Sequence, residues 1–158
     1  MNRLLEQLKN FDPIECAVLG VGNSLKGDDG VGSIIAGRLK NVEPLYVIDT
    51  GTVPENFIGK VLSTKRNVLV FIDAMDFGEK PGSYKFFGIE DIDDGDISTH
   101  APSLSYMLEI FKGGGEIQAY VIGIQPETIE LGEKISKRVE AAAKDITDIF
   151  IEWVRCSA

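Results

Sequence analysis

The sequence VLVFID, Val68 to Asp73, is the most strand-like run in the chain. Its apolar side chains follow one another without a polar interruption until Asp73, which is typical of a strand covered on both faces. Cys16 to Val21 (CAVLGV) has the same continuous apolar character, so we expect a second covered strand there. Strands of this kind belong to parallel sheets, whose crossover helices cover both faces. The two runs therefore predict an α/β protein.

Apolar spacing and turn residues place the remaining elements around these two strands. We expect further strands at residues 45–48, 83–87 and 117–122. We expect helices at residues 4–11, at 31–39, from Pro54 with Phe57, Ile58, Val61 and Leu62 inward, from Pro102 to Gly113, and finally along Ile135, Val139, Ala142, Ile146, Ile149 and Trp153. Strands alternating with helices predict a single-domain three-layer sandwich over residues 1–158, with a twisted, mostly parallel sheet between helices on both faces.

The composition limits the possible functions. The chain has 158 residues, 44% of them apolar, but no apolar run of membrane-spanning length and no secretory signal at its start, so we expect a cytoplasmic protein. The formal net charge is −9 and there is no basic cluster, which disfavours nucleic acid and anionic membranes as partners. A basic polypeptide segment or a cation suits this chain better. We interpret Cys16 as a buried strand thiol and Cys156 as a thiol of the tail.

Acidic side chains follow three of the predicted strands. Because parallel strands present their carboxyl ends at one edge, Asp29 (or Asp28), Asp49 and Asp73 are expected to converge there. Facing carboxylates repel, so such a cluster needs a cation or bound protons. His100 is the only histidine, and two carboxylates with one imidazole can bind zinc, nickel or another divalent ion. Taken singly, each aspartate could instead cap a helix or turn, and the histidine could be an exposed loop side chain.

Three other classes of protein share parts of this pattern. Asp49-Thr50-Gly51 matches the motif of aspartic peptidases, but those enzymes pair two copies on an all-β fold and this chain has one. A dinucleotide site is weakly supported, because Leu25 replaces the third glycine of the G-x-G-x-x-G pattern. A phospho-receiver module would use the acidic pair and Asp73. A receiver also requires a lysine at the end of its fifth strand. At that place this chain has Gly123-Ile124-Gln125-Pro126, with no lysine. The receiver is retained as the alternative class.

Five segments resemble the hydrogenase maturation proteases, most closely those of the hydrogenase 3 (formate hydrogenlyase) type. They lie in family order and span most of the chain: GNSLKGDDGVG from Gly22, VIDTGTVPEN from Val47, IDAMD from Ile72, Thr99-His100, and GIQPE from Gly123. The combination is specific, although no single segment would be.

The resemblance implies a metal-dependent endopeptidase that removes the carboxyl-terminal extension of a nickel-loaded [NiFe]-hydrogenase large-subunit precursor. It implies that Asp29, Asp73 and His100 are the metal ligands and the catalytic set, and that Asp49 and Gly51 bind substrate. The nickel would be supplied by the substrate, and zinc or cadmium could occupy the site in vitro. No small-molecule cofactor, nucleic acid or membrane is implied. Within the family, a protease for a deazaflavin-reducing hydrogenase of methanogens is the alternative.

Overall fold

The computed structural model describes residues 2–88, 97–98, 107, 109–110 and 116–158. The α-helices are α1 (Arg3–Leu8), α2 (Val31–Leu39), α3 (Ile58–Ser63) and α5 (Lys137–Ser157). Short 3-10 turns are η1 (Pro13–Glu15), η2 (Gly27–Gly30) and η3 (Pro54–Phe57). The strands are β1 (Cys16–Gly20), β2 (Tyr46–Asp49), β3 (Val68–Asp76), β4 (Tyr84–Gly88), β5 (Ile97–Ser98) and β6 (Gln118–Ile124). None of the helices in these ranges is long and apolar enough to cross a bilayer.

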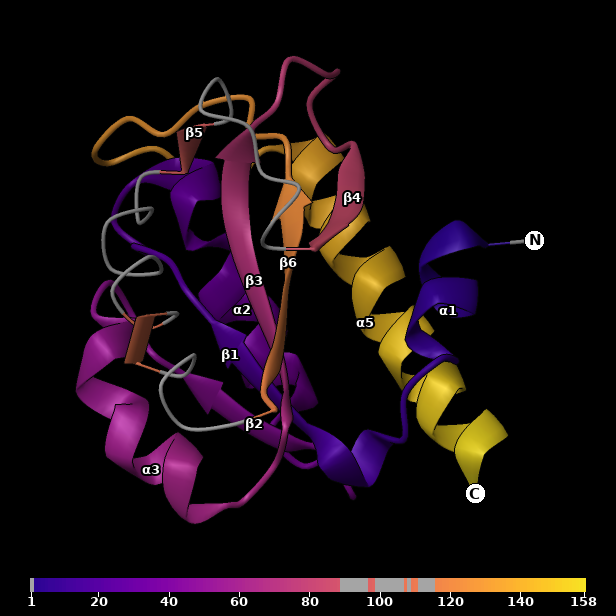
Figure 1. The fold of residues 1–158 in the computed structure, drawn as a ribbon. Coiled ribbons are helices and arrows are strands. Elements are labelled where there is room, and N and C mark those ends of the chain that lie inside the picture. The colour runs from indigo at the N-terminus through magenta and orange to yellow at the C-terminus, as the bar shows by residue number, and fades with distance from the viewer. Residues whose placement is uncertain (1, 89–96, 99–106, 108, 111–115) are drawn as a thin grey trace.

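The sheet has the order β2-β1-β3-β6-β4 (Figure 1). Neighbouring strands are parallel from β2 through β6, and β4 runs antiparallel to β6. The two strands first recognised in the sequence lie side by side at the centre, where Val18 pairs with Val70. Because central parallel strands are covered on both faces, their continuous apolar character is explained. The α/β prediction is confirmed.

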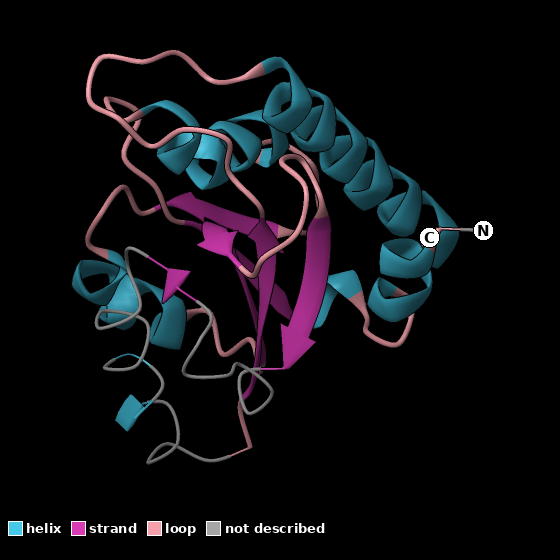
Figure 2. Ribbon diagram, turned by 90° about the horizontal axis from the view of Figure 1, so that it is seen from above, coloured by secondary structure: helices cyan, strands magenta, loops and turns pink. Residues whose placement is uncertain are grey.

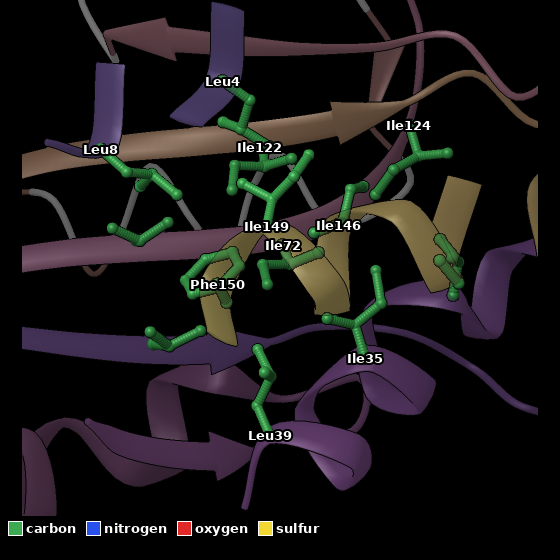
Figure 3. Packing of buried hydrophobic residues seen from close by; sticks show 14 of the residues in the cluster. Leu4, Leu8, Ile35, Leu39, Ile72, Ile122, Ile124, Ile146, Ile149 and Phe150 are labelled. Atoms are coloured by element: carbon green, nitrogen blue, oxygen red, sulfur yellow. The ribbon is translucent and has the colours of Figure 1, made fainter. Parts of the chain in front are cut away.

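Helices cover both faces of the sheet (Figure 2). On one face α1, α2 and α5 contribute Leu8, Ile35 and Phe150 to a cluster that packs on the strands (Figure 3). On the other face Val61 of α3 packs with strand residues that include Leu69 and Phe71. Alternate residues of each strand thus enter different clusters, and the predicted three layers are present.

Two strands extend further than their apolar runs predicted. We expected the third strand to end at Asp73 and the last at Ile122, but β3 continues to Asp76 and β6 to Ile124. The reason is pairing: Ala74 of β3 is matched by Ile124 of β6, and the last two residues of β3 are matched by β5. Asp73 therefore lies inside a strand rather than in the loop after it.

Three helix predictions were wrong in detail. The first helix, expected at residues 4–11, ends at Leu8, because the N–H of Phe11 bonds to the carbonyl of Leu8 in a tighter turn. Leu62, predicted to face inward, is 46% exposed, because the six-residue helix α3 presents only a narrow inner face around Val61. Ile135, predicted on the last helix, precedes it, since Ser136 caps α5 by accepting from the backbone N–H of Val139. The helix expected from Pro102 lies outside the described residues except for positions 107 and 109–110.

Candidate active site

The two adjacent aspartates of η2 have different roles. Asp28 is fully buried, and its carboxylate accepts hydrogen bonds from the backbone N–H groups of Glu127 (2.8 Å), Thr128 (3.2 Å) and Ser136 (2.7 Å) and from the Ser136 hydroxyl (2.9 Å). These bonds tie the loop of residues 125–136 to η2. Asp28 is therefore the residue that holds this loop, which favours Asp29 for the candidate ligand that the sequence left open between the two.

A close approach of helix α2 places η2 against β3. A Cβ atom added to Gly32 would lie 2.1 Å from the carbonyl oxygen of Ile72 and 2.3 Å from that of Val21. Only glycine fits there, so the first turn of α2 rests directly on the main chains of β1 and β3. Asp29, three residues earlier, borders the same hollow as Ala74, Met75 and Asp76 at the end of β3.

Asp29 borders a hollow of about 250 Å³ at the carboxyl edge of the sheet. We call this space the Asp29 hollow; its walls come from β3 and from the loop that Asp28 holds, and include Met75, Asp76, Gln125 and Ile129. Asp29 is 2% exposed. Asp73 is completely buried on β3, where it pairs in register with Gly123 of β6. The structure thus brings two of the three predicted ligands to neighbouring elements.

The third predicted ligand, His100, lies outside the described residues. The last described residue before His100 in the sequence is Ser98 of β5. Ser98 pairs with Met75, which lies two residues from Asp73 in β3. In the described ranges, no three histidine, cysteine or acidic side chains are grouped so that they could hold an ion. The proposed set of three therefore depends on His100.

A buried amide fixes Asp76 beside the Asp29 hollow. Gln125 is 7% exposed; its Oε1 accepts from the backbone N–H groups of Phe77 (2.8 Å) and Glu79 (3.2 Å), and its Nε2 donates to Asp76 Oδ1 (3.0 Å). The N–H of Gly78 donates to the same Asp76 oxygen. Asp76 is thereby held at the end of β3, on the wall shared with Asp29.

Asp49 lies at a separate hollow. It is the exposed last residue of β2, and its Oδ1 accepts from the N–H of Gly51 at 3.0 Å, in a turn where Gly51 has φ +57°. We call the space beside it the Asp49 hollow, of about 640 Å³, which is also bordered by Ser33, Asn56 and Phe57. Asp49 and Gly51 therefore lie together in one turn, beside a different hollow from Asp29.

Comparison with known proteins identifies the group to which this arrangement belongs. The family model of the HycI hydrogenase maturation proteases matches residues 31–153. The chain belongs to the hydrogenase maturation protease family. This membership confirms the resemblance seen in the five sequence segments and decides against a phospho-receiver. It also makes the protein an endopeptidase by family.

Relatives and solved structures agree with that assignment. A Methanocaldococcus jannaschii protein assigned to the same family is 30% identical over 161 residues, covering 96% of this chain and 94% of the relative. The hydrogenase 3 maturation protease of Escherichia coli K12 is 29% identical, covering 86% of this chain and 88% of its own. The crystal structure of the [NiFe] hydrogenase maturation protease HycI from Thermococcus kodakarensis matches with a TM-score of 0.77 and 25% identity. The match covers 96% of this chain and 99% of the other.

Sequence reasoning missed the two residues that organise the site, Asp28 and Gln125. Asp28 was considered only as a helix cap or as the alternative to Asp29. Gln125 was noted as part of the family-like segment GIQPE and as the place where a receiver would have lysine, but it was given no role. Gln125 directly follows the buried end of β6, which was the available signal for it, whereas Asp28 lies in η2, well beyond the end of β1, and offered no such signal. The partners of both residues lie far away in sequence.

Proposed function

We propose that this protein removes a carboxyl-terminal extension from a nickel-loaded [NiFe]-hydrogenase large-subunit precursor in the cytoplasm. The observation that carries the proposal is the pair of buried carboxylates, Asp29 and Asp73, on neighbouring elements of a hydrogenase maturation protease. A divalent metal can balance the charge of two carboxylates that lie close together in a buried place.

The donor set fits a nickel ion that arrives with the substrate. Asp29 and Asp73 would supply oxygen ligands and His100 a nitrogen ligand. Ser98, two positions before His100 in the sequence, pairs with Met75, and Met75 lies two residues from Asp73 in β3. A bound divalent ion polarises a carbonyl and lowers the pKa of water. Zinc or cadmium would fit the same donors in vitro.

The residues of this chain supply the proton transfer and the positioning. Asp76 lines the same hollow as Asp29, so it is better placed than Asp49 to take the proton of the water that adds to the scissile carbonyl. The leaving amine then takes that proton as the C–N bond breaks. Gln125 holds the Asp76 carboxylate in place for both transfers.

Asp49 and Gly51 are proposed to bind substrate rather than metal, since they border their own hollow at the same edge of the sheet. Asp49→Asn should therefore change which precursors are accepted more than it changes metal affinity. A metal titration of the isolated protein by calorimetry measures the metal affinity of the variant and of the wild type. Loss of all binding in Asp49→Asn would make Asp49 a ligand and contradict the assignment.

The deciding experiment offers the protein four substrates: casein, and large-subunit precursors that are nickel-loaded, nickel-free, or from a deazaflavin-reducing hydrogenase. Mass spectrometry should find one cut near the carboxyl terminus of a nickel-loaded precursor, and none in casein. His100→Ala should abolish the cut while circular dichroism stays unchanged. Efficient cleavage of the nickel-free precursor would overturn the role of the metal, and selective cleavage of the deazaflavin-type precursor would change the substrate within the family.

A further inference from the structure

Three apolar side chains stand exposed on the loop before η2 and on the loop of residues 125–136, which forms a wall of the Asp29 hollow. Leu25 is 68% exposed, Leu131 76% and Ile129 36%. Of the three, Ile129 also lines the Asp29 hollow, so the group includes one wall residue of the candidate active site. Exposed leucines scattered over a surface need no explanation, but a group at the rim of a site does.

Main-chain hydrogen bonds hold this group in a fixed shape. The N–H of Gly132 donates to the carbonyl of Leu25 at 2.9 Å, which places Leu131 next to Leu25 although they are far apart in sequence. The N–H of Gly27 donates to Glu133 and that of Asp28 to Thr128. Main-chain hydrogen bonds thus join the segment of residues 25–28 to the loop of residues 125–136. The buried carboxylate of Asp28 adds hydrogen bonds to the same loop.

Acidic side chains are interleaved with the apolar ones. Glu127, Glu130 and Glu133 are all exposed and alternate along the chain with Thr128, Ile129 and Leu131. Lys134 is also exposed and Lys26 is half-buried, so the acidic groups exceed the basic ones. We call Leu25, Ile129 and Leu131 with these three glutamates the paired-loop surface.

We propose that the paired-loop surface is the docking site for an extended segment of the hydrogenase precursor that carries apolar side chains next to lysine or arginine. The inference rests on the proposed function, because it names the same substrate. Its apolar part would cover the two leucines, and its basic part would meet the glutamates. Because Ile129 belongs to both, a segment bound here would lie next to the Asp29 hollow.

Docking on a preformed surface would also explain how substrate is selected without a deep pocket. Fixed loops lose little conformational entropy on binding, so the contacts of a few apolar side chains are not cancelled by ordering costs. The glutamates would raise the rate of encounter with a basic segment and make it dependent on salt.

The test compares a double variant, Leu25→Ser with Leu131→Ser, with the matched control Leu62→Ser on α3. All three positions are exposed, so none of the changes removes a buried contact. Binding of the nickel-loaded precursor to immobilised protein should weaken roughly tenfold to hundredfold in the double variant, as expected from two leucines re-exposed to water. The control should match the wild type. In processing assays the loss should appear in KM rather than kcat.

A charge variant tests the second half of the proposal. Glu130→Lys should weaken precursor binding severalfold at low salt, and the difference should shrink at 0.5 M salt, whereas Glu130→Gln should have about half the effect.

The outcomes separate this inference from the proposed function. Processing by the wild type with unchanged affinity in the double variant would disprove the docking site and leave the function standing. Failure of the wild type to bind or cleave the precursor would overturn both. Sedimentation that shows a wild-type dimer, lost in the double variant without a change in precursor affinity, would assign the surface to a second copy of the chain and disprove the proposal.

Discussion

At each end of the sheet one charged side chain binds several main-chain groups: an arginine at the amino end and an aspartate at the carboxyl end. At the amino end, Arg66 Nη1 donates to the carbonyl oxygens of Pro13 (3.2 Å), Cys16 (3.0 Å) and Pro44 (2.8 Å). At the carboxyl end, Asp28 accepts from three backbone N–H groups of one loop. In both places a single ionised side chain satisfies several main-chain groups that lie far from it in sequence.

The difference lies in what each charge organises. The carbonyls bound by Arg66 lie at the start of β1 and in the segments before β1 and β2, so this contact holds strand beginnings together. The loop bound by Asp28 forms a wall of the Asp29 hollow. Loss of Arg66 should therefore weaken the fold alone, whereas loss of Asp28 should weaken the fold and disorganise the site. Four measurements test this contrast.

The largest effect is expected from Asp28→Asn. The new amide N–H₂ would face backbone donors in a fully buried position, leaving at least one of them without an acceptor. We expect the free energy of unfolding to fall by about 2–4 kcal/mol, measured by urea titration. Hydrogen exchange of residues 127–136 should accelerate, and precursor processing should fall with it. The control is Glu116→Gln, at an exposed glutamate outside this loop and outside the paired-loop surface. Unchanged exchange in that loop would contradict the role given to Asp28.

Arg66→Met should cost less and should spare activity. Arg66 is only half-buried, so water can replace some of the lost donors, and a cost of about 1–3 kcal/mol is expected. Urea titration measures it, with the exposed Arg155→Met as control. Processing below the unfolding transition should equal that of the wild type. A fall in kcat would mean that the two ends of the sheet are coupled, and the contrast would fail.

The Cys16 thiol, near Arg66 at the amino end of the sheet, makes the stability of the protein depend on pH. Burial, aided by Glu15 and Asp12 and opposed by Arg66, raises the pKa of Cys16 from 9.0 to about 12. Above pH 9 the unfolded chain releases this proton and the folded chain keeps it, so stability is lost as the pH rises toward 12.

Between pH 8 and pH 10 the wild type should lose roughly 1 kcal/mol more than Cys16→Ala, both in a Cys156→Ser background. Urea titrations at the two pH values give the comparison. Equal losses would show that the Cys16 thiol ionises in the folded state much as it does in the unfolded chain.

The smallest change in stability is expected for an ion pair between two exposed side chains, which involves no main-chain group. Arg38 of α2 donates to Glu140 of α5 at 2.6 Å, but both side chains are about two-fifths exposed, at 38% and 42%. Arg38→Ala should change stability by no more than about 0.5 kcal/mol, and addition of salt should remove the difference. A larger cost in a thermal melt would mean that side-chain pairs matter here as much as the main-chain contacts of Arg66.

The same contrast explains which features the sequence could predict. Apolar runs such as Val68–Ile72 identified the central strands because burial on both faces leaves a local signature. Asp29 and Asp73 were placed on the correct edge because parallel strands share that edge. The end of β3 was misjudged because Asp76 is held by pairing with a strand over twenty residues away. The ligand set with His100, the substrate site at Asp49 and the single domain over residues 1–158 stay predictions.

The contact between Asp28 and Ser136 also has a consequence for biosynthesis. The two residues are separated by 108 positions, and β6, which lies between β3 and β4 in the sheet, follows both in the chain. A nascent chain that has released everything up to β4 would lack the central partner of β4 and the loop that closes the Asp29 hollow. Contacts of such long sequence separation form late in folding. The candidate active site of this protease is thus assembled only after nearly the whole chain has left the ribosome.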